Sequence, residues 1–188
     1  MRLKNKIAII TGSASGFGKG IAKKFSEEGA KLILVDINSN LLKKVSKSLF
    51  QDHFVADVSK DSNFKSLLKY AFKKYKAVDI IVNNAGITHK PKNMEAVTGR
   101  EFDRVFNVNC KSVYLTAKHF VPHFKDNKSG VILNIASTAG VSPRPNLNWY
   151  NSSKGWIILA SKTMAVELAP FGIRVNVINP VAGETPLL

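Results

Sequence analysis

Short apolar runs alternate along the chain with longer segments in which apolar residues recur every three or four positions. The apolar runs span 7–11, 31–36, 53–58, 78–84, 130–137 and 173–179, and their lengths are typical of buried strands. The segments between them, 17–28, 40–49, 61–75, 98–124 and 149–169, have the helical period. The pattern therefore predicts six strands connected by helices, with Gly29 ending the first helix.

Strands that are apolar on both faces, with a helix between each pair, are typical of a parallel sheet covered on both sides. Right-handed crossovers then give a doubly wound α/β fold of the Rossmann type. The sequence contains no repeat, low-complexity tract or linker. We expect residues 1–188 to form one domain.

Composition adds limits on the class of protein. With 188 residues and 45% hydrophobic content, the chain has the composition of a globular protein with a sizeable core. Its single cysteine, Cys110, excludes an internal disulfide. The apolar run near the N-terminus is too short for a signal peptide or a membrane span, so we expect a cytoplasmic protein without a membrane segment.

The formal net charge of +15 raises the possibility of a nucleic-acid partner. The basic residues, however, are spread over amphipathic segments such as 23–31, 41–47 and 67–76, and they form no arginine-rich block. This distribution is typical of solvated helix faces and argues against nucleic-acid binding. Attraction to an acidic partner stays open.

The stretch "TGSASGFGKG" follows the first strand and opens the first helix. Gly12, Gly16 and Gly18 permit a tight turn and a close approach of the backbone to a ligand. The N-terminus of the helix offers free amides and the positive end of its dipole to a pyrophosphate. A glycine turn can also serve only to pack a helix on a strand, but its place in a βαβ unit favours a dinucleotide site.

Asp36 ends the second strand, where its carboxylate could accept hydrogen bonds from the adenosine ribose. The same charge would repel a 2′-phosphate. No Arg or Lys in 37–40 or 12–18 could receive that phosphate. The sequence therefore favours NAD over NADP, the alternative being an acid that merely faces solvent.

Tyr150 and Lys154 are four residues apart in "WYNSSKG", which on a helix places them one turn apart on one face. The pairs Tyr70–Lys74 and Tyr114–Lys118 have the same spacing. Spacing alone thus leaves open whether Tyr150 and Lys154 are catalytic or a polar surface pair. The two other pairs lie in predicted helices that have neither a serine at a strand end nor a glycine turn beside them.

The glycine spacing resembles the first turn of the short-chain dehydrogenase/reductase family. Four further stretches are similar to that family and occur in its order: "NNAG" (83–86), "NVN" (107–109), Ser137 after the fifth apolar run, and "YNSSK" (150–154); "RVNVINP" (174–180) fits the sixth strand. The resemblance covers nearly the whole chain. In general appearance it is similar to the 3-oxoacyl-carrier-protein reductases.

The resemblance implies reversible hydride transfer between a nicotinamide and a carbonyl or alcohol. Tyr150 would be the general acid and base. Because an ordinary phenol holds its proton at neutral pH, a cation beside it is needed to favour the phenolate, and Lys154 would supply it. Lys154 would also hold the nicotinamide ribose, and Ser137 would bind the substrate oxygen.

Asn109 lies on the apolar stripe of segment 98–124, and a buried amide needs partners. Taken alone, it could bond the backbone of a neighbouring element. The resemblance implies instead that it holds a water linking Lys154 to solvent.

Most of the remaining site residues follow from the resemblance. The cofactor-binding set it implies is Gly12, Ser15, Gly16, Phe17, Gly18, Asp36, Asp57, Val58, Asn84, Ala85, Gly86, Tyr150, Lys154 and Thr185. His119 and His123 share a helix face but have no third ligand, so we predict no metal.

Two features depart from the family pattern. Val181 follows Pro180 where a glycine is common, with Gly183 two residues later. The sequence stops at Leu188, where the family continues into substrate-covering helices and a seventh strand. The resemblance therefore implies a C-terminally truncated or incompletely represented member.

The substrate cannot be derived from the sequence. A small carbonyl or alcohol compound, a sugar, and an acyl carrier stay as alternatives, and a non-catalytic nucleotide- or RNA-binding protein is the alternative of another class. The family resemblance implies a homo-oligomer, a dimer or a tetramer.

Overall fold

The structure, a computed structural model, describes residues 1–181 and 183. Its strands are β1 (Ile7–Thr11), β2 (Lys31–Asp36), β3 (Asp52–Val55), β4 (Ile80–Asn83), β5 (Gly130–Ile135) and β6 (Ile173–Ile178). Its helices are α1 (Gly16–Glu27), α2 (Ser39–Leu49), α3 (Asp61–Tyr75), α4 (Gly99–Asn109), α5 (Lys111–Asp126) and α6 (Asn148–Leu168). Short 3-10 helices lie at Met94–Ala96 (η1), Thr138–Gly140 (η2) and Ala169–Phe171 (η3).

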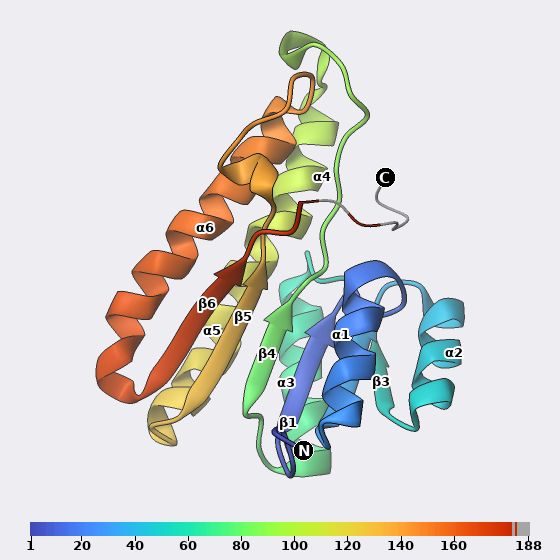
Figure 1. Ribbon diagram of the computed structural model, residues 1–188, viewed down its shortest axis with the longest axis vertical. Coiled ribbons are helices and arrows are strands. Elements are labelled where there is room, and N and C mark those ends of the chain that lie inside the picture. Colours follow the sequence, from blue (N-terminus) through green and yellow to red (C-terminus); the bar gives the residue numbers. More distant parts are fainter. Residues whose placement is uncertain (182, 184–188) are drawn as a thin grey trace.

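The strands of this part of the chain form one parallel sheet in the order β3-β2-β1-β4-β5-β6. Alternate residues of each central strand enter two separate cores. Ile10 of β1 packs in the core that includes residues of α1 and α2, whereas Ile9 packs in the core that includes residues of α3, α5 and α6. Figure 1 shows α1 in front of the sheet and α3 and α5 behind it. The predicted doubly wound α/β fold is confirmed.

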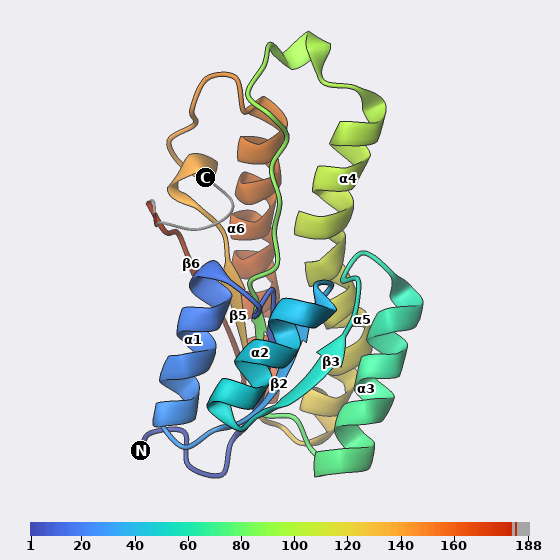
Figure 2. The same ribbon diagram turned by 90° about the vertical axis from the view of Figure 1, so that its right-hand side faces the viewer.

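The order of the strands reverses between β1 and β4, because β2 lies on one side of β1 and β4 on the other. The connections that follow β1 and β4 therefore diverge and leave a crevice at the carboxyl ends of these strands. Figures 1 and 2 show α4 extending past that end of the sheet, where it packs against α6. This is the part of the fold that can hold a ligand.

The prediction of one helix over 98–124 is wrong, because α4 ends at Asn109 and α5 begins at Lys111. The Ser112 hydroxyl donates to the carbonyl of Asn109 at 3.4 Å, and the Val113 amide bonds the carbonyl of Cys110 at 3.1 Å. The regular hydrogen-bond pattern of the α-helix is therefore interrupted at Cys110. Thr98 caps the start of α4 in a capping box with Glu101, as the helix start predicted at Thr98 requires.

The third strand is also shorter than predicted, since β3 ends at Val55 rather than at Val58. Asp57 forms a turn in which its carboxylate accepts from the amide and hydroxyl of Ser59 at 2.9 and 2.6 Å. The fifth strand likewise ends at Ile135, two residues before Ser137. Within residues 1–181 and 183, no helix has both the length and the apolar character needed to cross a bilayer.

Candidate active site

A cleft of about 640 Å³ opens at the carboxyl ends of the strands. Of the predicted site residues, it is lined by Gly12, Ser15, Gly16, Phe17, Asp36, Asp57, Val58, Asn84, Ala85, Gly86, Ser137, Tyr150 and Lys154. The structure thus brings the glycine turn, the acidic strand end and the Tyr–Lys pair to one cavity. Thr185 lies outside the described residues.

The glycines of the first turn have two different tasks. Gly12 has a φ of +65°, and a Cβ there would lie 2.8 Å from the Cα of Ala85. Gly18 does not line the cleft, and a Cβ on it would lie 2.1 Å from the carbonyl oxygen of Gly12. Gly12 therefore shapes the turn, whereas Gly18 lets α1 pack directly on it.

Asn84 fastens the end of β4 to the glycine turn. Its side-chain amide donates to the carbonyls of Thr11 and Gly12 at 2.9 and 3.1 Å. The buried Thr11 hydroxyl accepts from the amides of Asn84 and Ala85 at 3.0 and 3.1 Å. The two loops that frame the crevice are therefore held together by side chains. Thr11 was not identified from the sequence, although a hydroxyl ending an apolar strand was a signal.

The acidic residues at the other side of the cleft are fixed by backbone amides. Asp36 accepts from the amides of Ala14 and Asn38 at 3.0 and 2.9 Å, one on each carboxylate oxygen. An ionised carboxylate has about four acceptor sites, so each oxygen keeps capacity for a ligand hydroxyl. Asp57 is held in the turn described above, next to the buried Val58.

The catalytic candidates come from α6 and from the segment after β5. Tyr150 and Lys154 lie one turn apart, with the Lys154 ammonium 5.8 Å from the centroid of the Tyr150 ring. Ser137 is 9% exposed, and its hydroxyl accepts from the amide of Ala139 at 3.1 Å. The hydroxyl thus caps η2 through an oxygen lone pair, which leaves its hydrogen to donate to a substrate oxygen.

Lys154 is 3% exposed and donates one hydrogen bond, to the carbonyl of Ile135 at 3.0 Å, within the described chain. Burial disfavours the ammonium and lowers the pKa of Lys154 to about 8. Burial likewise raises the pKa of the neighbouring Cys110 thiol to about 12, and the charge of Lys154 acts in the opposite direction. Gly86 makes room for this ammonium, since a Cβ there would lie 3.2 Å from it.

Asn109 is 1% exposed and joins three elements. Its oxygen accepts from the amide of Ile87 at 2.9 Å, while its amide donates at 2.9 Å to the carbonyl of Ile87 and to the hydroxyl of Ser153. The Ser153 hydroxyl in turn donates to the carbonyl of Tyr150 at 2.7 Å. Asn109 therefore bonds the backbone of a neighbouring element, one of the two alternatives that the sequence leaves open.

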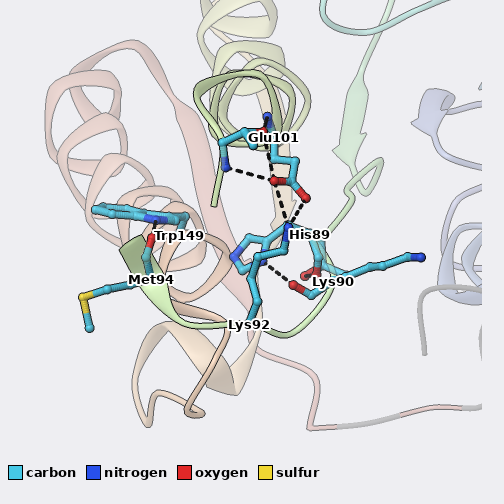
Figure 3. A network of polar contacts seen from close by, with 8 residues as sticks. His89, Lys90, Lys92, Met94, Glu101 and Trp149 are labelled. Carbon is cyan, nitrogen blue, oxygen red and sulfur yellow. Dashed lines mark hydrogen bonds and ion pairs between the residues drawn. The ribbon is translucent and has the colours of Figure 1, made fainter. Parts of the chain in front are cut away.

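The segment between β4 and α4 is held against both helices beside the cleft (Figure 3). Lys92 donates to both carboxylate oxygens of Glu101 at 2.8 and 3.1 Å, and the Trp149 indole donates to the carbonyl of Met94 at 3.1 Å. The Lys92 hydrogen bond and those of Thr98 lower the pKa of Glu101 to about 2, so this carboxylate stays charged. These bonds tie the segment that follows Ile87 and Thr88, which line the cleft, to α4 and α6.

Several lining residues had no assigned role in the sequence analysis. They are Ile37, Ala56, Ser59, Ile87, Thr88, Arg104, Asn107, Val108, Ile135, Ala136, Ala139, Arg144, Leu147, Pro180, Val181 and Gly183. Ser153 was missed as well, although it stands inside the recognised "YNSSK". In the part of the chain described here, no group of three or more His, Cys, Asp and Glu side chains could hold a metal ion.

The residues present fit a dinucleotide. A Cβ at Gly12 would lie 2.8 Å from the Cα of Ala85, so glycine lets the turn pass this close to the end of β4. Ser15 does not cap α1 with its side chain within the described residues, which leaves the first amides of the helix to receive a phosphate.

Asp36 ends β2 and lines the cleft, where its carboxylate could accept hydrogen bonds from an adenosine ribose. An ammonium has three N–H donors, and within the described residues Lys154 uses one of them, in its bond to the carbonyl of Ile135. Two donors are left for a ligand.

Comparison with known proteins agrees with this geometry. The family model described as short chain dehydrogenase matches residues 6–188. The 4-formylbenzenesulfonate dehydrogenase of Comamonas testosteroni is 42% identical over 193 residues, which cover 100% of this chain and 77% of that protein. A 3-oxoacyl-[acyl-carrier-protein] reductase of Thermotoga maritima is 35% identical, over 100% of this chain and 78% of its own.

Among solved structures, the 3-ketoacyl-(acyl-carrier-protein) reductase of Brucella melitensis complexed with NADH superposes with a TM-score of 0.97. It is 48% identical, and the match covers 99% of this chain and 79% of that one. A family model that spans almost the whole chain, relatives above 30% identity and a matching fold all agree. The chain belongs to the short-chain dehydrogenase/reductase family and is an NAD(P)-dependent oxidoreductase acting on alcohol or carbonyl groups.

Proposed function

We propose that this enzyme uses Tyr150 as the general acid and base for hydride transfer between NAD(H) and a carbonyl or secondary alcohol. One observation carries the proposal: Ser137, Tyr150 and Lys154 line the same cleft as the glycine turn and Asp36. Bound NADH supplies the hydride, and NAD accepts it in the reverse direction. The chain itself must then bind the substrate oxygen and move one proton.

The proton is transferred at the Tyr150 hydroxyl, which donates to the carbonyl oxygen in reduction and accepts from the alcohol in oxidation. The Lys154 ammonium, 5.8 Å from the Tyr150 ring centroid, is placed to stabilise negative charge that develops on the Tyr150 oxygen during the transfer. Ser137 donates its hydroxyl hydrogen to the same substrate oxygen and stabilises charge that develops there. Asn109 is proposed to hold a water that returns protons to Lys154 from solvent.

We propose NAD as the preferred cofactor over NADP. Asp36 supports this preference, because its two oxygens are oriented by Ala14 and Asn38 and its charge would oppose a 2′-phosphate. The Brucella melitensis relative was solved with NADH. Asp36→Ala is expected to relax the ratio of kcat/KM for NADH over NADPH at least tenfold, and an unchanged ratio would contradict the assignment.

The substrate is proposed to be a small carbonyl or alcohol compound, with an acyl carrier as the second possibility. The two relatives, a 4-formylbenzenesulfonate dehydrogenase and a 3-oxoacyl-[acyl-carrier-protein] reductase, support one class each. The basic surface would suit an acidic carrier. We further propose a cytoplasmic homo-oligomer, a dimer or tetramer. Large apolar side chains exposed on α5 and α6 support it: Tyr114, Trp156, Leu159 and Val166.

A panel of carbonyl and alcohol compounds, followed by NADH absorbance, tests the reaction. Tyr150→Phe is expected to lower kcat by a factor of about 10²–10⁴ while the Kd for NADH changes less than twofold, because the substitution removes only the transferable proton. Tyr70→Phe is the control, since Tyr70 has a lysine at the same spacing but does not line the cleft. Retained turnover in Tyr150→Phe would refute the role, and RNA binding with steep salt dependence but no NADH binding would favour the non-catalytic alternative.

A further inference from the structure

Arg144 is a charged side chain of the cleft for which the proposed chemistry has no use. It lies in the segment 141–147 between η2 and α6 and lines the cleft. Its carbonyl accepts from the side-chain amide of Asn151 at 2.7 Å, and Asn151 is 7% exposed and adjacent to Tyr150. The backbone of Arg144 is therefore anchored to the catalytic turn of α6.

The side chain of Arg144 reaches the opposite wall of the cleft. Its Nη2 donates to the carbonyl of Val181 at 3.2 Å, in the segment that follows β6. The loop that carries it is fixed on another side, because the amide of Lys92 donates to the carbonyl of Asn146 at 3.0 Å. The indole bond of Trp149 to Met94 ties the start of α6 to the same segment between β4 and α4 (Figure 3). The guanidinium is thus held beside the catalytic end of the cleft.

The charges in the cleft are divided between its two ends. The cations that line the described part of the cleft are Lys154 and Arg144, from segment 135–154, and Arg104, from α4. The other described lining residues of segments 135–154 and 180–183 are apolar or uncharged. The acids that line the cleft, Asp36 and Asp57, stand at β2 and after β3. These strands are three and four positions from β5 in the sheet, or about 14–19 Å at about 4.8 Å per strand.

That separation exceeds the screening length of about 8 Å at physiological salt, so the two acids cancel little of the positive potential at the catalytic end. The guanidinium carries five N–H donors in a planar fork, of which the bond to Val181 uses one. The remaining donors match two oxygens of a carboxylate, sulfonate or phosphate. Lys154 is buried and committed to the reacting centre, whereas Arg104 on α4 and Arg144 are both exposed lining residues. Of the two arginines, Arg144 is the one hydrogen-bonded to the segment after β6, so it is the candidate to meet an anion.

We infer that the substrate carries an anionic group in addition to its carbonyl or alcohol, and that Arg144 binds this group and determines specificity. The inference rests on the proposed function, because it takes Tyr150 and Ser137 as the place of the reacting oxygen. It narrows the substrate class to anionic carbonyl compounds and their alcohols.

The test compares substrates that differ in charge and little in shape. Wild-type enzyme is assayed with 4-formylbenzoate against 4-formylbenzamide, and with acetoacetate against acetoacetamide, at constant NADH. We expect kcat/KM to favour the anion of at least one pair by about 10- to 100-fold, the size of one or two charge-assisted hydrogen bonds. In Arg144→Gln this ratio should fall towards one, with an intermediate value in Arg144→Lys. Arg100→Gln is the control, because Arg100 is exposed on α4 and does not line the cleft.

Equal kcat/KM within both pairs, or a ratio that Arg144→Gln does not change, would overturn the inference while the proposed function stands. If NADH binds but no carbonyl compound is reduced, the proposed function fails, and a binding measurement decides the inference. Calorimetry of benzoate and benzamide on the enzyme–NADH complex should then show tighter binding of benzoate in wild type and no preference in Arg144→Gln. Equal binding of both compounds to wild type would overturn it.

Discussion

The cofactor end of the cleft and its catalytic end position their functional groups in different ways. At the cofactor end, backbone conformation and close backbone packing shape the turn: Gly12 adopts a positive φ and Gly18 lets α1 pack on the turn. The side chains of Thr11 and Asn84 then join this turn to the end of β4. At the catalytic end, side chains that are distant in the sequence hold one another. Asn109 on α4 bonds Ile87 and Ser153, and Ser153 bonds the Tyr150 carbonyl.

The difference shows why the two ends should respond differently to substitution. Where backbone segments pack in direct contact, an added side-chain atom has no room. A substitution there should therefore impair folding and cofactor binding. The protein can lose one hydrogen bond of a buried side-chain network and still fold. A substitution in such a network should therefore lower kcat. The following predictions test this contrast, from the largest expected effect to the smallest.

Gly18→Ala should give the largest effect on stability. Its Cβ would lie 2.1 Å from the Gly12 carbonyl oxygen, and neither backbone segment can give way cheaply. We expect a loss of about 3–5 kcal/mol in the free energy of unfolding, the range of severe packing defects, together with loss of NADH binding. The measurement is urea denaturation followed by circular dichroism.

Gly20→Ala provides the matched control on the same helix. A Cβ at Gly20 meets nothing within 4 Å. The substitution should stabilise the protein by about 0.5–1 kcal/mol through helix propensity and leave the Kd for NADH unchanged. If both variants lost stability alike, the contrast between a packed and an open glycine would be wrong.

Lys154→Met should stabilise the folded protein at neutral pH and abolish turnover. The pKa of Lys154 is lowered from 10.5 to about 8, so the unfolded chain binds the extra proton between about pH 8 and pH 10.5. The free energy of unfolding of the wild-type protein should therefore rise between about pH 8 and pH 10.5. Below about pH 8, burying the charged Lys154 ammonium destabilises the folded protein by about 3 kcal/mol.

The difference in unfolding free energy between Lys154→Met and wild type should thus be largest at pH 7 and shrink towards pH 10.5. Parallel urea titrations at several pH values measure it, with exposed Lys43→Met as the control that shows no such trend. A constant difference from pH 7 to pH 10.5 would show that burial does not lower the pKa of Lys154.

Ser153→Ala should give a smaller effect, confined to rate. It removes the bonds of Ser153 to Asn109 and to the Tyr150 carbonyl, which position the catalytic turn of α6. We expect kcat to fall about tenfold, equivalent to about 1.4 kcal/mol, with little change in the Kd for NADH. Ser152→Ala is the neighbouring exposed control. Unchanged kcat in Ser153→Ala would mean that Tyr150 is positioned without this network.

A last prediction concerns chemical reactivity and not stability or turnover: burial raises the pKa of the Cys110 thiol to about 12. Because the thiolate is the reactive form, iodoacetamide at pH 8 should modify folded protein at least about 100-fold more slowly than urea-unfolded protein. Mass spectrometry of the alkylated fraction over time measures both rates. Equal rates would show that the catalytic end opens to solvent more readily than its burial indicates.

The sequence by itself determined the sheet, the glycine turn and the family. Periodicity is a local property, and residues such as Gly12 and Asp36 act through the backbone conformation or strand end where they stand. The ordered motifs around Ser137, Tyr150 and Lys154 also lie within single elements. For these features, neighbouring residues in the chain carry enough information.

Only the tertiary structure decided how the catalytic end is held together. The link from Asn109 to Ile87 and Ser153 and the placement of Arg144 opposite Val181 both join segments 20 to 45 residues apart. A buried polar group must find a partner, but the sequence does not say which one, because several partners satisfy the same periodicity. That choice depends on how α4 packs on α6 beyond the carboxyl ends of the strands, which no local pattern encodes.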